Sequence, residues 1–340
     1  MNAMPSKSAV AMALAGALAA TAPRAETVAE FYRGKTVRIV NWASAGGEYD
    51  IHGRLVSRYI GRHIPGAPTL VHQTMTGGGG IVAANYLYNV APKDGTSLAI
   101  MPSSLALFQA LEDKAIKYDA AKFNWIGTIA PTQENLVSWH TSGFTSHEDL
   151  SRREFALGAS GAGSTSVIVP TVMNALLGAK IKLVPGYPGG NEINLAMERG
   201  ESQGRWNTWS AWKVTKPDWI AEKKINVLVQ SALTKPRDLQ GPPLLADLAK
   251  SEDDRKIFEL LATAAELGRP LVASPDVPAE RMQALIDAYR AMLADAEFIR
   301  EAQQTKIEIA PLIGRDLQSL VTRALSTPKP LAERLKKLIE

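Results

Sequence analysis

The sequence predicts an α/β protein of two lobes, each a mostly parallel sheet flanked by helices, with a cleft between the lobes. Short β-rich runs alternate with helical runs after residue 35, which is typical of a largely parallel sheet. The same order of strand, glycine-rich turn and helix begins again near residue 155, which indicates a second lobe. No flexible Pro/Gly linker separates the halves, so we expect a hinge of paired chain crossings rather than tethered domains.

The first lobe begins with a β-rich run, residues 36–42, which is broken by Gly46-Gly47 before a helical pattern starts. A run of four glycines at 77–80 is interpreted as a tight connection between the next strand and helix. The expected strands are 36–42, 69–73 and 96–101, and the expected helices are 49–64 and 81–90.

The second lobe repeats this order, and helices dominate the remainder of the chain. The expected strands are 155–159, 181–184, 202–206 and 225–230, and the expected helices are 164–177, 192–199, 279–294, 296–305, 315–324 and 331–339. We place residues 26–130 in the first lobe, 131–228 in the second, and 229–340 back on the first. The crossings are expected near 126–130 and 225–230.

The N-terminal segment, residues 1–25, has the pattern of a signal peptide. Lys7 is followed by an uncharged run that extends to Ala22. That run is shorter than the roughly 20 apolar residues that a transmembrane helix needs, and small residues follow it. We therefore expect export, with cleavage after Ala20, Ala22 or Ala25.

Composition excludes several classes of function. The formal net charge is +4, the signs are mixed, and no dense Lys/Arg block occurs, so nucleic acid is not an expected partner. The absence of cysteine excludes disulfides, Cys-based zinc sites and thiol nucleophiles. The five histidines show no metal-ligand spacing, and no G-x-S-x-G motif is present. We therefore predict no catalytic residue, no metal and no cofactor.

The first candidate binding motif follows the first strand. A helix N-terminus there would offer unpaired N–H groups and a positive dipole end, and its glycines would let a ligand approach the backbone closely. The alternative is an ordinary turn in which Asp50 satisfies the first helical N–H groups. The candidate residues are Trp42, Ser44, Ala45, Gly46, Gly47, Tyr49 and Asp50.

The second candidate motif has the same design in the second lobe, with hydroxyl donors added. Its spacing is not G-x-G-x-x-G, and it lacks the Gly-Lys-Ser/Thr of a phosphate-binding loop. The alternative is again an ordinary turn. The candidate residues are Ser160, Gly161, Gly163, Ser164 and Thr165.

A third candidate region is rich in tryptophan, with three in residues 205–212. Arg205 is a candidate partner for a carboxylate, Asn207 for a hydrogen bond, and Trp206 for an apolar wall. The alternative is packing of the tryptophans in the core or between the lobes, above all for Trp212.

With these motifs in hand, the chain resembles the solute receptors of tripartite tricarboxylate transporters, the Bug or TctC-like family, from Thr36 onward. The segments that carry the resemblance are 46–50, 85–96, 161–164, 186–192, 268–270 and 275–279. The sequence departs from the family pattern at 42–45, where a Pro-rich lead-in is common, and at 74–77, where Asn-Met-Pro-Gly is usual.

The resemblance implies a type II periplasmic-binding-protein-like fold and cleft closure on a small organic carboxylate, either a di- or tricarboxylate or an aromatic acid. It adds Ser103, Ser104 and Tyr187 to the candidate ligand-binding residues. It also implies a periplasmic monomer that delivers its ligand to the membrane subunits of such a transporter. The competing hypotheses are a two-domain α/β enzyme acting on a small carboxylate and a periplasmic sensor domain.

Overall fold

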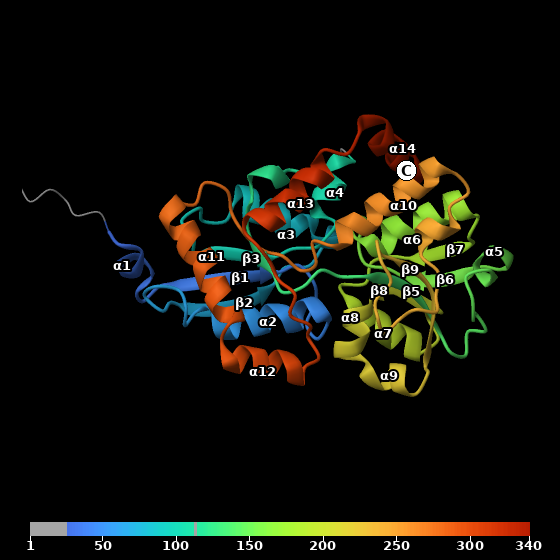
Figure 1. Ribbon diagram of the computed structural model, residues 1–340, viewed down its shortest axis with the longest axis horizontal. Helices are drawn as coiled ribbons and strands as arrows, with labels where there is room; N and C mark the ends of the chain where they lie inside the picture. Colours follow the sequence, from blue (N-terminus) through green and yellow to red (C-terminus); the bar gives the residue numbers. More distant parts are fainter. Residues whose placement is uncertain (1–25, 112–113) are drawn as a thin grey trace, which may run out of the picture.

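The computed structural model describes residues 26–111 and 114–340, which form two lobes side by side (Figure 1). The predicted leader lies outside the described residues. Each lobe contains one mixed sheet, so the predicted two-lobed α/β architecture is confirmed. The strand orders are β11-β4-β10-β3-β1-β2 and β7-β6-β8-β5-β9.

The first lobe is built on the six-stranded sheet. Strands β1, β2 and β3 pair in parallel, whereas β10 runs antiparallel to both β3 and β4. Strands β1 to β4 therefore run in one direction, as predicted for a mostly parallel sheet. The strands are β1 (Thr36–Asn41), β2 (Thr69–Thr74), β3 (Ser97–Ile100), β4 (Asn124–Thr128), β10 (Leu271–Ala273) and β11 (Leu312–Ile313).

Helices cover both faces of this sheet. One core joins the sheet to α2, α11 and α12, and a second core joins it to α3, α4 and α13. The helices of this lobe are α1 (Val28–Tyr32), α2 (Glu48–Ile60), α3 (Ile81–Asn89), α4 (Leu105–Ala110), α11 (Ala279–Leu293), α12 (Ala296–Gln304) and α13 (Arg315–Leu325), with 3₁₀ turns η1 (Gly78–Gly80) and η2 (Ala120–Lys122).

The second lobe is built on the five-stranded sheet. Strand β5 runs antiparallel to both neighbours, β8 and β9, while β6 pairs in parallel with β7 and β8. The start of β5 therefore lies at the same edge of the sheet as the ends of β6 and β8. The strands are β5 (Glu134–Trp139), β6 (Phe155–Gly158), β7 (Ile181–Val184), β8 (Gly204–Thr208) and β9 (Ile225–Ser231).

The helices of the second lobe also lie on two faces. The larger core includes side chains of α6, α10 and α14, and a smaller tryptophan-rich core includes those of α7, α8 and α9. These helices are α5 (Asp149–Arg152), α6 (Thr165–Leu177), α7 (Gly190–Glu198), α8 (Trp209–Thr215), α9 (Pro217–Ala221), α10 (Glu252–Ala265) and α14 (Lys329–Ile339), with the 3₁₀ turn η3 (Leu245–Leu248).

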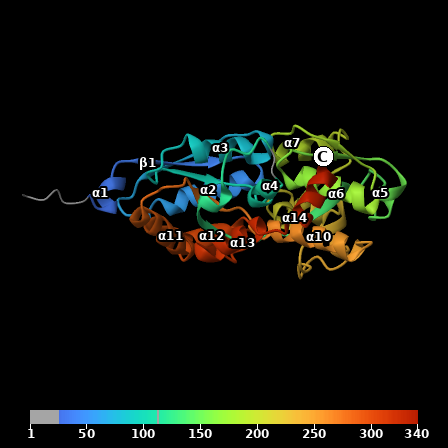
Figure 2. The same cartoon turned by 90° about the horizontal axis from the view of Figure 1, so that it is seen from above.

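The chain crosses between the lobes at 129–133, at 266–270 and at 326–328. The first crossing follows β4, and the expected stretch was 126–130. The second lies about 40 residues beyond the expected one, because α10 packs on β9 and η3 of the second lobe. The third carries α14 onto α6, as Figure 2 shows. The expectation that all of 229–340 packs on the first lobe therefore does not fit the packing of α10 and α14.

Most local boundaries agree with the predicted ones, but several elements were not predicted. Helix α6 ends at Gly178, which has the left-handed conformation (φ 72°) of a helix C-cap. Strand β8 lies two residues later than expected, and β4, β5, β10, α8 and α10 were not assigned from the sequence. Within 26–111 and 114–340, no helix has the length and apolarity that a membrane crossing requires.

Candidate functional site

A small cavity of about 90 Å³ lies between the two lobes. Its walls come from segments that follow β1, β3 and β6, from the end of β8, and from the start of β5. This is the edge at which ligands bind in open α/β sheets. The lining residues are Trp42, Ala43, Gly47, Glu48, Tyr49, Pro102, Ser103, Ser104, Glu134, Ser160, Ser164, Thr165, Ser166, Gly189, Gly190, Ile193, Arg205, Trp206, Asn207, Thr208 and Arg269.

The N-termini of helices α2, α6 and α7 converge on this cavity. Their N-cap residues are Gly47, Ser164 and Gly189, and in none of them does a side chain cap the helix. The first turn of α6 also contains no acidic residue. Uncapped helix starts present N–H donors and the positive end of the helix dipole. The cavity is thus suited to an anion, with contributions from both lobes.

Three serine hydroxyls form a buried cluster at the start of α6. The Ser164 Oγ lies 2.8 Å from the Ser160 Oγ and 2.6 Å from the Ser166 Oγ. The Ser166 Oγ also accepts a hydrogen bond of 3.1 Å from the Ser160 N–H. This cluster fixes the loop that precedes α6 and places hydroxyl groups on the cavity wall.

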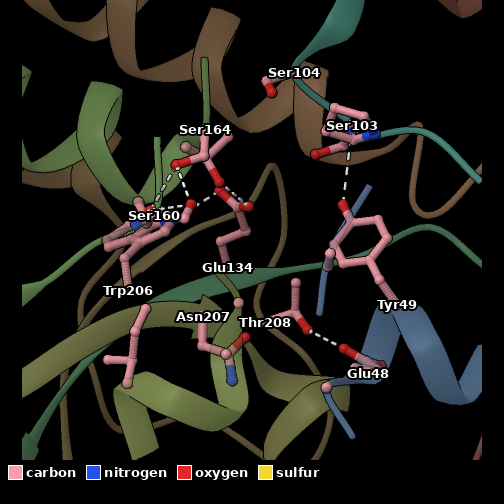
Figure 3. Close-up of a pocket in the computed structure, with 18 of the residues that line it drawn as sticks. Glu48, Tyr49, Ser103, Ser104, Glu134, Ser160, Ser164, Trp206, Asn207 and Thr208 are labelled. Carbon is pink, nitrogen blue, oxygen red and sulfur yellow. Dashed lines mark hydrogen bonds between the residues drawn. The ribbon is translucent and has the colours of Figure 1, made fainter. Parts of the chain in front are cut away.

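Two buried carboxyls also face the cavity (Figure 3). Glu134 accepts hydrogen bonds from the Thr165 hydroxyl (2.6 Å) and the Trp206 indole N–H (2.8 Å). Glu48 accepts one from the Thr208 hydroxyl (2.9 Å) and forms an ion pair with Arg269. Burial raises the pKa of both carboxyls, although Arg269 acts in the opposite direction.

Glu48 connects three parts of the molecule. It is the first residue of α2 in the first lobe, Thr208 ends β8 in the second lobe, and Arg269 lies in the second crossing. The Arg269 guanidinium also donates to the Thr208 hydroxyl (2.7 Å) and lies 5.3 Å from the centre of the Tyr49 ring. The ion pair between Glu48 and Arg269 therefore joins the two lobes at the wall of the cavity.

The Arg205 guanidinium forms hydrogen bonds to other residues of the protein. It donates to the Gly190 carbonyl (2.6 Å) and to the Asn194 side-chain oxygen (2.9 Å), and it lies over the Trp212 ring. Burial lowers the pKa of Arg205 to about 10. Arg205 thus lines the cavity while it supports the start of α7.

The lobes contact each other around the cavity. The Ser44 hydroxyl donates to Glu192 (2.7 Å), the Ser104 hydroxyl donates to the Gly163 carbonyl (2.7 Å), and the Gly163 N–H donates to the Gly78 carbonyl (3.3 Å). A side chain at Gly161 would prevent this approach, because its Cβ would lie 2.2 Å from the Gly79 nitrogen. The four-glycine run is therefore part of the surface on which the lobes meet, as well as a tight connection.

The structure brings many of the sequence-predicted residues together. Those that line the cavity are Trp42, Gly47, Tyr49, Ser103, Ser104, Ser160, Ser164, Thr165, Arg205, Trp206 and Asn207. Those outside the lining are Ser44, Ala45, Gly46, Asp50, Gly161, Gly163 and Tyr187. Direct ligand contact remains a prediction for all of them.

Asp50 illustrates the alternative that was left open for the first motif. Its carboxylate accepts hydrogen bonds from the Gly46 N–H (3.0 Å), Arg54 (2.9 Å) and His72 (2.9 Å). Asp50 therefore stabilises the turn before α2 and does not line the cavity.

Some lining residues were missed by the sequence analysis. Glu48 and the glycines before α7 lie inside quoted motifs, but nothing marked them as cavity residues. Glu134 is the first residue of β5, and Arg269 lies in the second crossing, within the quoted segment 268–270; nothing in the sequence marked either of them as a cavity residue. The missed residues are Ala43, Glu48, Glu134, Ser166, Gly189, Gly190, Ile193 and Arg269.

Comparison with known proteins gives matches in structure only: no family model and no curated protein sequence matches the chain. The periplasmic binding protein BugD matches with a TM-score of 0.73 at 18% identity, over 90% of this chain and 98% of its own. R. palustris Rpa4515 with adipate matches with a TM-score of 0.69 at 20% identity, over 90% and 97%. MatC from Rhodopseudomonas palustris with bound malate matches with a TM-score of 0.69 at 19% identity, over 90% and 99%.

The fold is that of two-lobed periplasmic binding proteins, and a cavity lies between the lobes. More specifically, the chain has the fold of the Bug and TctC-like receptors, so the resemblance inferred from the sequence is confirmed at the level of the fold. Among the described residues, no group of His, Asp or Glu side chains is placed to hold a metal ion.

Proposed function

We propose that the protein is an exported, periplasmic solute receptor that captures a small organic carboxylate between its lobes and delivers it to the membrane subunits of a tripartite tricarboxylate-type transporter. The observation that carries this proposal is the convergence of the uncapped starts of α2, α6 and α7 on one interlobe cavity. The adipate and malate bound by the two R. palustris proteins of this fold support a carboxylate.

The carboxylate is held chiefly by backbone N–H groups, with help from the serine cluster. A charge-assisted hydrogen bond contributes roughly 1.5–3 kcal/mol, so a few such bonds suffice for micromolar affinity. The volume of about 90 Å³ favours a compact acid, because pockets for drug-sized ligands are typically about 300–1,000 Å³.

Closure of the two lobes links binding of the carboxylate to its delivery to the membrane subunits. The contacts between Ser44 and Glu192 and between Gly163 and Gly78 form only when the lobes meet. A ligand that contacts both lobes stabilises this arrangement by its differential affinity for the closed state. The membrane subunits then recognise a surface that includes both lobes.

An enzymatic function is less well supported by the cavity. Its lining contains no histidine, lysine or cysteine, and the hydroxyls of Ser160, Ser164 and Ser166 are hydrogen-bonded to one another.

The test is a thermal-shift screen of mono-, di- and tricarboxylates, aromatic acids included, each paired with its neutral amide. A ligand that binds the folded state raises the melting temperature, and the amides should not. Calorimetry then gives the affinity for each hit. If no carboxylate stabilises the protein at millimolar concentration, the proposed function is wrong.

A further inference from the structure

We propose that the protein takes up a proton together with its ligand: Glu134 binds the proton, and the neutral carboxyl group donates a hydrogen bond to the captured carboxylate, directly or through the Thr165 hydroxyl. The proton comes from the solvent and is released when the ligand leaves. This inference rests on the proposed function and adds to it a positioning residue and a dependence on pH.

The first observation is that Glu134 faces the cavity with neutral hydrogen-bond partners. Its side chain is buried, its Oε1 atom accepts from the Thr165 hydroxyl (2.6 Å), and its Oε2 atom accepts from the Trp206 indole N–H (2.8 Å). The indole can only donate, so Oε2 stays an acceptor and the proton binds at Oε1. The Thr165 hydroxyl can accept as well as donate, so it suits either form of Glu134.

The second observation is the charge of the cavity lining, which sums to zero when both of its carboxyls are ionised. The charged residues are Glu48 from α2, Glu134 from β5, Arg205 from β8 and Arg269 from the second crossing. Glu48 is neutralised by its ion pair with Arg269, whereas Arg205 donates to neutral groups of α7. A ligand carboxylate adds one negative charge, and protonation of Glu134 restores the neutral sum.

The third observation is the small size of the cavity. Its volume of about 90 Å³ cannot keep a ligand carboxylate far from Glu134. When two carboxyl groups share a buried site, the pKa of one of them rises strongly, because the two like charges repel each other. Burial already raises the pKa of Glu134 without a ligand, although Arg269 acts in the opposite direction. A bound carboxylate raises it further.

The other polar groups of the wall favour a donor at this position. The Trp42 Nε1 and Asn207 Nδ2 atoms are buried donors without a hydrogen-bond partner, and the start of α6 presents backbone N–H groups. An ionised Glu134 is an acceptor only, and it would face the acceptor oxygens of the ligand. A protonated Glu134 adds one more donor to the same wall.

The neighbouring elements contain no titratable group that is better placed to take up this proton. Figure 3 shows Glu134 beside Ser164, and Glu48 apart from them beside Thr208. Burial raises the pKa of Glu48 as well, but the Arg269 ion pair stabilises its ionised form. Burial and the charge of Glu134 raise the pKa of Tyr49 above 10, so Tyr49 stays neutral.

The remaining neighbours of Glu134 do not titrate near neutral pH. The residue opposite it on β9 is Ser231, and no histidine belongs to the cavity lining. Burial lowers the pKa of His52, behind the cavity, to about 3. A proton taken up with the ligand near neutral pH is therefore assigned to Glu134.

The experiment is calorimetry with malate, adipate and the acid that gives the largest thermal shift. It is run from about pH 6.5 to about pH 8.5, where such carboxylic acids are almost fully ionised. Each titration is repeated in buffers with different enthalpies of ionisation, so that the measured heat gives the number of protons taken up per ligand.

Two variants complete the design. Glu134→Gln is the test, because its amide keeps an acceptor for Trp206 and offers a donor to the ligand, as a protonated Glu134 does. Glu266→Gln is the matched control. Burial raises the pKa of Glu266 too, but Glu266 lies outside the cavity lining.

The wild-type protein should take up about one proton per ligand, and its affinity should fall about tenfold or more between the two ends of the pH range. Glu134→Gln should take up no proton and should bind with little dependence on pH. At the upper end of the range it should bind more tightly than the wild type, because it has no charge to repel the ligand. Glu266→Gln should behave like the wild type.

Two results would overturn the inference and leave the receptor function intact. One is carboxylate binding by the wild type without proton uptake, and the other is proton uptake that persists in Glu134→Gln. Failure of every acid to bind would overturn both proposals. If Glu134→Gln does not fold, the proton uptake of the wild type and its pH dependence decide alone.

Discussion

His52 shows how a residue behind the site affects the stability of the whole protein. It lies in α2, one turn after Glu48, is 6% exposed, and has its Nδ1 atom 2.9 Å from the Glu48 carbonyl. Burial lowers the pKa of His52 to about 3, from an ordinary value of 6.5. The imidazole is therefore neutral in the folded state at any pH near neutrality, although the unfolded chain binds a proton below about pH 6.5.

The first prediction follows from this difference in proton binding. As the pH falls through 6.5 toward 3, the unfolded state gains a proton that the folded state rejects, so the free energy of unfolding decreases. The contribution of His52 should amount to a loss of about 2 kcal/mol between pH 7 and pH 5. Urea unfolding at the two pH values should show a smaller loss for His52→Gln than for the wild type.

His140→Gln is the control for this measurement, because His140 is exposed. It should leave the pH dependence of the wild type unchanged. An equal loss in the wild type and in His52→Gln would show that His52 does not govern the acid sensitivity.

At the scale of elements, the glycine-rich loops determine how closely the lobes approach. A Cβ on Gly163 would lie 2.8 Å from the Gly78 carbonyl oxygen and 3.0 Å from side-chain carbons of Ile81. A Cβ on Gly47 would meet only ordinary contacts of 3.8 and 3.9 Å. The two loops resemble each other in sequence but differ in what surrounds them.

The second prediction concerns Gly163→Val, which should hold the lobes apart while each lobe folds. The expected result is a loss of carboxylate affinity of about tenfold or more, because the helix starts of the two lobes no longer reach the same ligand. Calorimetry measures the affinity, and circular dichroism checks the fold. Gly47→Ala should bind nearly as well as the wild type, and a Gly163→Val protein with wild-type affinity would contradict this role.

Secondary structure could be predicted best where it depends on residues that are close together in the sequence. Strands followed by glycine-rich turns and helices could be predicted, because periodicity and helix ends depend on neighbouring residues. The two carboxyls of the cavity were missed: Glu48 lies within a quoted motif, and Glu134 follows the first crossing. Glu134 reaches the cavity only because β5 runs antiparallel to β8, a pairing between residues more than 60 positions apart. No local pattern contains that information.

For the whole molecule, the third prediction is that ligand binding compacts the protein. The lobes contact each other through Ser44 and Glu192 and through Gly78 and Gly163, and a ligand between them favours these contacts. Small-angle scattering should give a smaller radius of gyration with a saturating carboxylate than without it. Gly163→Val should show no such decrease, and an unchanged wild-type curve would indicate a rigid cavity.

The third crossing brings α14 back to the core of the second lobe, which affects the order in which the protein folds. Leu335 of α14 is fully buried in the core of the second lobe, about 200 residues after the start of β5 in the same lobe. Contacts so distant along the chain slow folding, because a long loop must close before they form. The second lobe cannot complete its core until this last helix has been synthesised. We therefore expect the second lobe of the nascent chain to remain incompletely folded until late in synthesis.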